Sequence, residues 1–366
     1  MMILKENLML ALTIGGSMAG KNKVVPIFEY IKCEIANGNL VVTSNDGECE
    51  AKYSVPYEHS DANFAFCVAS KDFINTIKSI KDNNVELLCE GDKVIIKHSK
   101  GNASLPYNDA KVFPQATNDG VASMAVMPSD KIAEWLKTSQ NFVGRDDLRS
   151  IMQGMLLRFT PHLCEVCATD AHKLFCDDYT LTEEYAPFEA VIPSRCFGAL
   201  SAILGTCGEV AIYNYDRNIE FVGNNCSISI RKIEGVFPNF RAVIPQVAPN
   251  DAHFVVSKAD FIESVSRAGI YVELATSKLK LNLCNGKLHI NGTNLEFDKY
   301  ADEYLNVQGG NSVGFEMYLK ADYLLSCLNS IIDDKVGVSV IDSQRPIVLT
   351  DEARQGKTII QMPMVG

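Results

Sequence analysis

The feature that most constrains this chain is an internal repeat that occurs three times. Asp46, Asp170 and Asn294 each follow a strand-like segment, and they are spaced 124 residues apart. The string Val-Phe-Pro at residues 112–114 returns at residues 236–238 with the same offset. Self-similarity at a fixed period indicates that one structural unit is repeated along the chain. The sequence therefore predicts three copies of one module.

Each copy is predicted to contain two helices and a larger number of strands. Val/Ile-rich segments begin at Val85, Val210 and Val336, and residues 90–93 and 216–218 are typical of hairpin turns. Apolar residues recur at a spacing of three to four, which is typical of helices, over residues 4–14, 70–81, 129–140, 194–204, 257–269 and 320–331. Two helices and about eight strands per copy indicate an α+β fold and exclude a parallel βαβ array. The boundaries near residues 118–120 and 248–250 give domains 1–121, 122–247 and 248–366.

The composition is that of an ordinary globular chain. Of 366 residues, 47% are hydrophobic and 22% are charged, and the net charge is −11, which excludes a disordered or collagen-like chain. No segment approaches the roughly 18 consecutive apolar residues of a membrane-spanning helix. The 12 cysteines are scattered singly along the chain. This pattern indicates reduced, mostly buried thiols in a cytoplasmic protein.

One segment contains several residues of the types that bind zinc. Cys164, Cys167, His172 and Cys176 lie at short spacing, close to that of a zinc knuckle. Residues 163–168 have the pattern of a strand, however, which would place Cys164 and Cys167 on opposite faces. The same segment offers Cys167 and His172 as the nucleophile and base of a hydrolase, but no known nucleophile signature surrounds them. Buried strand thiols are the preferred interpretation, and a zinc-dependent binding module and a cytosolic Cys/His hydrolase are the alternatives.

The predicted helices are more basic than the rest of the chain. They contain 10 basic and seven acidic residues and so carry +3, whereas the remainder carries −14. Solvated helix faces that mix charges would give a similar bias. Together with the threefold repeat, the bias favours helices gathered on one surface. Such a surface could face a phosphate backbone without reading its base sequence.

Three strings connect the chain to a known family. Residues 168–174 read Ala-Thr-Asp-Ala-His-Lys-Leu, residues 237–245 read Phe-Pro-Asn-Phe-Arg-Ala-Val-Ile-Pro, and residues 362–364 read Met-Pro-Met. In their order and spacing these strings make the chain resemble, over its whole length, the bacterial sliding clamp, the beta subunit of DNA polymerase III. The resemblance implies the DNA clamp fold, in which protomers of three domains associate head to tail as a ring-forming homodimer.

The resemblance also implies a function. It predicts a processivity factor that is not an enzyme, uses no cofactor or metal, and encircles double-stranded DNA without sequence preference. The implied protein partners are the DNA polymerase III alpha subunit, the clamp loader and other clamp-binding replication and repair proteins. No membrane partner is implied.

Three sets of site residues follow from the resemblance. The dimer interface would contain Ala103, Leu105, Ile270 and Tyr271. The partner-peptide cleft would be formed by Met152, Thr169, His172, Leu174, Pro238, Val243, Tyr323, Pro346, Ile360, Met362, Pro363 and Met364. The DNA-facing residues would be Lys21, Lys23, Lys71, Lys78, Lys81, Lys131, Lys137, Arg145, Arg195, Lys258, Arg267 and Lys320. The chain departs from the family at Ala171, where glycine is usual, at Ala242, where arginine is usual, and at Ala103, where an aromatic residue is frequent.

Overall fold

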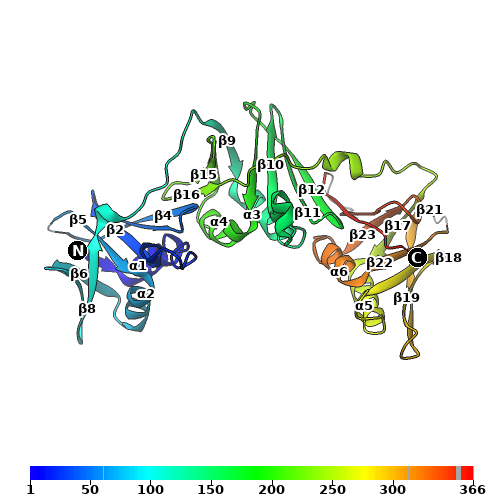
Figure 1. The fold of residues 1–366 in the computed structure, drawn as a ribbon, viewed down its shortest axis with the longest axis horizontal. Helices are drawn as coiled ribbons and strands as arrows, with labels where there is room; N and C mark the ends of the chain where they lie inside the picture. The colour runs from blue at the N-terminus through cyan, green and yellow to red at the C-terminus, as the bar shows by residue number, and fades with distance from the viewer. Residues whose placement is uncertain (61, 312–313, 352–355, 366) are drawn as a thin grey trace. The chain divides into compact units, whose positions relative to one another are not determined.

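The computed structural model describes residues 1–60, 62–311, 314–351 and 356–365, and each predicted module contains its two helices (Figure 1). The first module contains β1 (Met2–Leu4), α1 (Lys5–Ile14), β2 (Tyr30–Ala36), β3 (Asn39–Asn45), β4 (Cys49–Pro56), β5 (Phe64–Ala69), α2 (Ser70–Ser79), β6 (Asn84–Glu90), β7 (Lys93–His98) and β8 (Gly101–Asp109). The second contains β9 (Ser123–Pro128), α3 (Ser129–Ser139), β10 (Gly154–Thr160), β11 (Leu163–Thr169), β12 (Lys173–Thr180), β13 (Phe188–Pro193), α4 (Phe197–Leu204), β14 (Glu209–Asn214), β15 (Asn218–Val222) and β16 (Cys226–Arg231). The third contains β17 (Ala252–Ser257), α5 (Lys258–Gly269), β18 (Lys278–Cys284), β19 (Lys287–Asn294), β20 (Lys299–Asn306), β21 (Gln308–Asn311), β22 (Glu316–Lys320), α6 (Ala321–Asn329), β23 (Lys335–Val340), β24 (Ile347–Asp351) and β25 (Thr358–Gln361).

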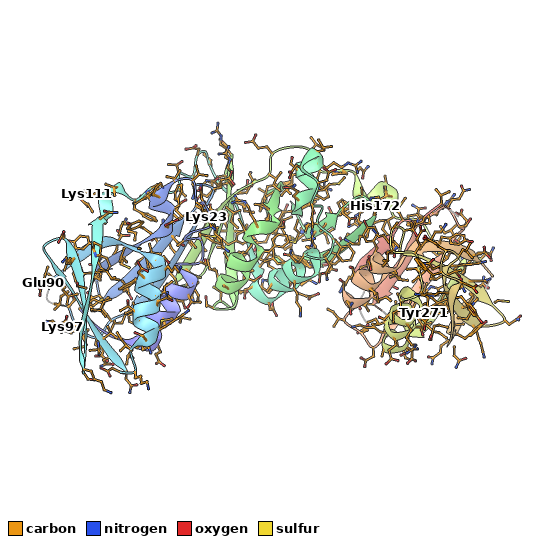
Figure 2. The ribbon with its side chains drawn as sticks, turned by 60° about the horizontal axis from the view of Figure 1, so that its bottom comes forward. Lys23, Glu90, Lys97, Lys111, His172 and Tyr271 are labelled. Atoms are coloured by element: carbon orange, nitrogen blue, oxygen red, sulfur yellow. The ribbon has the colours of Figure 1, made fainter. Side chains whose placement is uncertain are left out.

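The elements lie close to their predicted positions because local hydrophobic periodicity determines them. In α2, Phe73 and Ile77 are one helical turn apart and both are buried. In β7, Val94 and Ile96 are buried, whereas Lys97 is exposed (Figure 2). Helix α2 ends at Ser79, two residues before the predicted end, because the next residue adopts an extended backbone. The segment predicted as a helix over 194–204 begins with a short 3-10 helix, η4 (Ser194–Cys196), that leads into α4.

The chain divides into two compact units, and the division falls within the second module. The first unit comprises Met1–Glu134 and Arg195–Lys232, and the second comprises Trp135–Ser194 and Ile233–Gly366. The first unit contains a 12-stranded sheet in the order β1-β6-β7-β8-β5-β2-β3-β4-β16-β15-β14-β9. Antiparallel pairing of β4 with β16 joins the strands of the first module to those of the second. We call this pairing the first seam.

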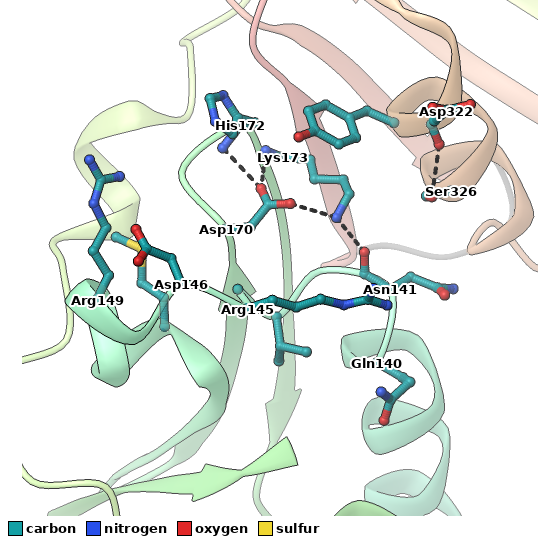
Figure 3. A pocket seen from close by; sticks show the side chains of 14 residues that line it. Gln140, Asn141, Arg145, Asp146, Arg149, Asp170, His172, Lys173, Asp322 and Ser326 are labelled. Atoms are coloured by element: carbon teal, nitrogen blue, oxygen red, sulfur yellow. Dashed lines mark hydrogen bonds and ion pairs between the residues drawn. The ribbon is translucent and has the colours of Figure 1, made fainter. Parts of the chain in front are cut away.

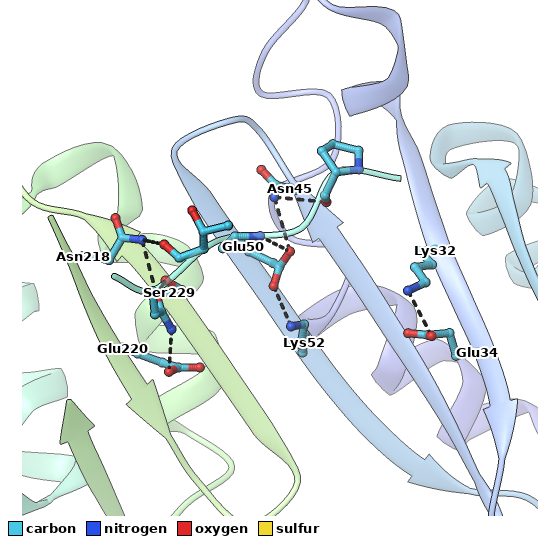
Figure 4. A network of polar contacts seen from close by, with 12 residues as sticks. Lys32, Glu34, Asn45, Glu50, Lys52, Asn218, Glu220 and Ser229 are labelled. Atoms are coloured by element: carbon cyan, nitrogen blue, oxygen red, sulfur yellow. Dashed lines mark hydrogen bonds and ion pairs between the residues drawn. The ribbon is translucent and has the colours of Figure 1, made fainter. Parts of the chain in front are cut away.

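The connecting segment 114–118 crosses the first seam and hydrogen-bonds to strands of both modules (Figure 4). The Asn118 side-chain amide donates to Glu220 at 2.9 Å and accepts from the Ser229 hydroxyl at 3.0 Å. The backbone amide of Ala116 donates to Glu50 at 2.9 Å. Polar groups of this segment are therefore satisfied by side chains on both sides of the seam.

The second unit contains a nine-stranded sheet in the order β13-β10-β11-β12-β25-β24-β23-β17-β21 and a four-stranded sheet in the order β20-β19-β18-β22. Antiparallel pairing of β12 with β25 joins the second module to the third, with Leu174 opposite Ile360. We call this pairing the second seam. The side chain of Trp135 is fully buried in this unit, and its Nε1 donates to Asp177 at 2.8 Å.

The predicted repeat is visible in the turns that follow equivalent strands. Asp46 accepts hydrogen bonds from the backbone amides of Glu48 and Cys49 at 3.0 and 2.7 Å. Asp170 accepts them from the amides of His172 and Lys173, both at 2.9 Å. The side chain selected by the 124-residue spacing therefore builds the same turn in the first two modules.

Candidate functional site

A pocket of about 640 Å³ lies beside the second seam and is lined by three residues of the predicted peptide cleft (Figure 3). These residues are Met152, His172 and Tyr323. The lining comes from the segment after α3, from the turn between β11 and β12, and from α6. The second seam therefore brings together residues that are far apart in the sequence.

Asp170 organises the turn that presents His172. One carboxylate oxygen of Asp170 accepts the two backbone amides described above, and the other forms an ion pair with Lys173 Nζ at 2.7 Å. The Lys173 ammonium also donates to the backbone carbonyl of Asn141 at 2.5 Å. Because Lys173 is buried, these bonds compensate its desolvation and tie the turn to the end of α3.

The aromatic ring of Tyr323 connects this turn to α6. It stacks with the His172 ring at a centroid distance of 5.7 Å and an interplanar angle of 25°. The Lys173 Nζ lies 5.3 Å from the Tyr323 ring centroid and 5.4 Å from that of Phe142. The pocket therefore combines aromatic surface with a fixed positive charge.

The C-terminal segment after β25 runs alongside the same turn. The backbone amide of Met362 donates to the His172 carbonyl at 2.8 Å, and that of Met364 donates to the Tyr318 carbonyl at 2.8 Å. The Met362 side chain is 38% exposed, and Pro363 and Met364 are half-buried. Predicted cleft residues of this segment thus present apolar, adaptable side chains next to His172.

The remaining predicted cleft residues divide into buried and accessible groups. Thr169, Leu174, Pro346 and Ile360 are buried. Leu174 and Ile360 pack in one apolar cluster with Phe237 and Phe240. Two further predicted residues remain accessible, Val243, which is exposed, and Pro238, which is half-buried. We infer that the buried group supports the site, whereas the accessible residues are available for contact with a ligand.

The segment that carries Pro238 and Val243 is anchored by Arg241. Its Nη2 lies 2.6 Å from a Glu165 oxygen and 2.5 Å from an Asp178 oxygen. The guanidinium lies 5.2 Å from the centroid of Phe240, which is itself buried. Burial raises the pKa of Asp178, although Arg241 opposes that shift. These contacts fix the short 3-10 helix η5 (Phe240–Val243) against β11 and β12.

Sequence reasoning missed several polar residues of the pocket. Lys173, Asp322 and Arg149 line it but were not predicted as site residues, and Arg145 was predicted to face DNA yet lines this pocket. Asp146 was missed although it is an N-cap whose side chain accepts from the Leu148 amide at 3.0 Å. That cap is a recognisable sequence signal for the short helix η3 (Asp147–Gln153). Nothing in the local sequence indicates that Asp146 lies near α6.

Apart from Arg145, which lines the pocket, the predicted DNA-facing residues fall into two groups. The exposed members without a described role elsewhere are Lys21, Lys23, Lys71, Lys78, Lys81 and Lys137. The others make internal contacts. Arg195 bonds to Asp46 and Glu48, and Arg267 bonds to Glu263 and Glu303. Lys258 donates to the Ile331 carbonyl, Lys320 lies over the Tyr323 ring, and Lys131 lies near Glu134. Carboxylate neighbours partly neutralise the two arginines, so they are weaker candidates for phosphate contacts.

The four predicted interface residues lie at accessible positions. Ala103 and Leu105 are half-buried on β8, which pairs with β7 over residues 101–106 and with β5 only over residues 107–109. Ile270 and Tyr271 follow α5 and are 76% and 39% exposed. Part of β8 therefore has a sheet edge available for pairing.

The two cysteine-based alternatives lack the geometry that they require. Cys167 lies opposite Cys176 in the β11–β12 pairing, and both are buried in the apolar cluster, whereas His172 is exposed in the following turn. Burial raises the pKa of Cys167 well above its usual value, which opposes nucleophilic reactivity. Within the described part of the chain, no group of three or more His, Cys, Asp or Glu side chains could hold a metal ion.

The repeated α+β modules and their seams define a class of fold. The sliding clamp of Pseudomonas aeruginosa superposes with a TM-score of 0.93 at 21% identity, covering 100% of this chain and 99% of that chain. The beta subunit of Streptococcus pyogenes DNA polymerase superposes with a TM-score of 0.94 at 18% identity, with the same coverage. The fold is therefore the clamp fold predicted from the sequence.

Sequence comparison identifies the family. The DNA polymerase III beta subunit models for the N-terminal, central and C-terminal domains match residues 1–117, 126–239 and 241–365. The Haemophilus influenzae beta sliding clamp is 21% identical over 365 residues, covering 99% of this chain and 98% of that protein. The Streptococcus pneumoniae beta sliding clamp is 22% identical over 365 residues, covering 95% and 96%. The chain belongs to the DNA polymerase III beta subunit family. No helix among the residues described has the length and apolar character needed to cross a membrane.

Proposed function

We propose that two copies of this chain form a head-to-tail ring around duplex DNA and tether the replicative polymerase to it. The matches to three consecutive beta-subunit domain models carry this proposal. In this function the chain is a non-catalytic accessory protein of the cytoplasm. Its three domains are 1–121, 122–247 and 248–366. A clamp loader, using its own ATP, would open and close the ring.

The pocket at the second seam is the proposed binding site for short peptides of the polymerase alpha subunit, the clamp loader and repair proteins. A related clamp, that of Pseudomonas aeruginosa, is known bound to griselimycin. The pocket of this chain offers Met152, His172, Tyr323 and the exposed Met362. Such a combination of aromatic and methionine surface suits apolar side chains of varied short motifs.

DNA would be held by enclosure, with weak contacts to the phosphates. The exposed lysines of α2 and α3, Lys71, Lys78 and Lys137, are the proposed DNA-facing groups, together with Lys21 and Lys23. Each phosphate neutralised by a lysine adds salt-dependent affinity but no sequence preference. A ring needs few such contacts, because escape requires opening an interface.

The ring would close through the free edge of β8 in one copy and the end of α5 in the next. Leu105 and Ile270 supply apolar surface, and unpaired backbone groups of β8 supply hydrogen bonds. The small side chain of Ala103 leaves Leu105 and Tyr271 as the larger contacts.

Retention on DNA of different topology tests the function directly. The protein is loaded onto nicked circular DNA with a bacterial clamp loader, freed of unbound protein by gel filtration, and divided into two samples. A restriction enzyme linearises the DNA of one sample. We expect retention on the circle and loss from the linear form, and retention on the linear form returns when its ends are blocked with bound protein. Equal retention on open linear and circular DNA would refute topological enclosure.

A further inference from the structure

Two thiols outside the candidate site lie close enough to react with each other. The Sγ atoms of Cys207 and Cys226 are 3.3 Å apart, although the residues are 19 positions apart in the sequence. Cys207 follows α4, and Cys226 is the first residue of β16. The Thr206 hydroxyl lies 3.7 Å from each sulfur.

The pair of thiols borders the first seam. Cys226 lies directly opposite Tyr53 of β4 in the pairing that forms this seam. Burial raises the pKa of Tyr53, and both thiols are close enough to add to that shift. A bond between the sulfurs would thus connect the end of α4 to the strand that joins the two modules.

A glycine provides the space in which the sulfurs meet. A Cβ atom at Gly223 would lie 2.2 Å from the Cys207 sulfur and 2.9 Å from the Cys226 sulfur. Any side chain at this position would displace one of the thiols. The backbone amide of Gly223 donates to the Cys226 carbonyl at 2.9 Å, which holds the glycine beside the pair.

The two thiols differ in their access to solvent. Cys207 is half-buried, whereas Cys226 is only 7% exposed. Burial and the contact with Cys207 raise the pKa of Cys226 to about 11. A soluble oxidant would therefore reach Cys207 first. Cys49 and Cys196 are also neighbours in the first unit, but both are buried and so are less accessible to an oxidant.

We propose that Cys207 and Cys226 are an oxidative modification site at which a peroxide forms a reversible disulfide. The Cys207 thiolate attacks one oxygen of hydrogen peroxide, the O–O bond breaks, and Cys207 becomes a sulfenic acid with release of water. The Cys226 sulfur then attacks the Cys207 sulfur, the S–O bond breaks, and a second water carries away the oxygen and the thiol proton. A dithiol reductant returns both residues to thiols. The disulfide ties the end of α4 to β16 within the second module and so stabilises the first unit.

Peptide mapping of the oxidised full-length chain tests this site. The reduced protein is treated with hydrogen peroxide, alkylated and digested without reduction. We expect a peptide pair linked through Cys207 and Cys226, the loss of two alkylatable thiols, reversal by dithiothreitol and a higher thermal unfolding midpoint. Cys207→Ser should abolish all four effects. Cys284→Ser, which removes an exposed cysteine elsewhere, should abolish none.

Two results would overturn the proposal. Sulfinic acid at Cys207 with a free thiol at Cys226 would show that the pair does not close. A linked peptide without any rise in the unfolding midpoint would refute the stabilisation of the first unit.

Discussion

Replacing Ala171 with glycine is expected to stabilise the second unit. Ala171 lies in the turn between β11 and β12 with φ at +73°, and the residue 124 positions earlier is Gly47, with φ at +94°. The left-handed conformation costs a residue with a Cβ about 1–2 kcal/mol, because the Cβ approaches a carbonyl oxygen. Glycine also gives the unfolded chain more conformational entropy, which lowers the stability by about 0.5–1 kcal/mol. The net gain for Ala171→Gly is therefore about 0.5–1 kcal/mol.

The single tryptophan of the chain provides the assay. Trp135 is buried in the second unit, which also contains Ala171, so its fluorescence reports the unfolding of that unit. For a urea dependence of about 2 kcal/mol/M, the expected gain moves the midpoint upward by about 0.3–0.5 M.

Gly47→Ala is the matched control. Its Cβ would meet the Phe28 ring at 3.3 Å, and its φ is equally unfavourable for alanine. Because Gly47 belongs to the first unit, this substitution should lower the stability of that unit, measured by circular dichroism, and leave the Trp135 transition in place. An unchanged or lower midpoint for Ala171→Gly would refute the assignment of strain to this turn.

Two further substitutions and one deletion test the proposed surfaces. Arg241→Ala should weaken the binding of a fluorescent polymerase peptide about tenfold, because the loss of charged hydrogen bonds worth about 1.5 kcal/mol frees η5; unchanged anisotropy titrations would contradict this anchoring role. Deletion of residues 362–366, of which the last lies outside the described residues, should abolish the same binding while Trp135 fluorescence stays native, and full binding by the truncated chain would exclude this segment from the site. Leu105→Asp should convert a dimer of twice 40.3 kDa into a monomer by light scattering, since it buries a charge in the proposed interface, with Val121→Asp as the exposed control; a persistent dimer would argue against this edge.

Most of the fold could be predicted because local patterns determine its elements. Helix α2 has buried side chains one turn apart, and β7 alternates buried and less buried residues. Each element can therefore be predicted from about ten residues of sequence. The repeat also predicted that the modules share local structure, and Asp46 and Asp170 do build the same turn. Pairing across the seams could not be predicted from periodicity, because Leu174 and Ile360 meet only through long-range strand pairing.

The charged parts of the site were predicted least well. From its position after a turn, Lys173 would be expected to be exposed to solvent. It is instead buried between Asp170, the backbone carbonyl of Asn141 and two aromatic rings. Lys357 and Asp351 form a fully buried ion pair at 3.0 Å, although both belong to a charge-rich stretch of sequence. Burial of a charge depends on partners supplied by distant segments, and a single sequence does not reveal which partners meet.

The two seams show how repeated modules acquire different sites. A smaller pocket of about 280 Å³ borders the first seam and contains Phe28, Glu48 and Cys49. The residues 124 positions later are Met152, His172 and Lys173, and these line the larger pocket.

The connecting segments account for part of the difference between these pockets. At the first seam, Ala116 donates its amide to Glu50, so the segment lies across the strands and lines the pocket. At the equivalent position of the second seam, Phe240 is buried in the apolar cluster and Arg241 is bound to Glu165, which anchors the segment away from the pocket lining. With an aromatic anchor in place of the small residue, the connecting segment lies outside the pocket lining, and its Pro238 and Val243 remain accessible. Divergence between modules, more than the fold that they share, therefore accounts for the different pockets at the two seams.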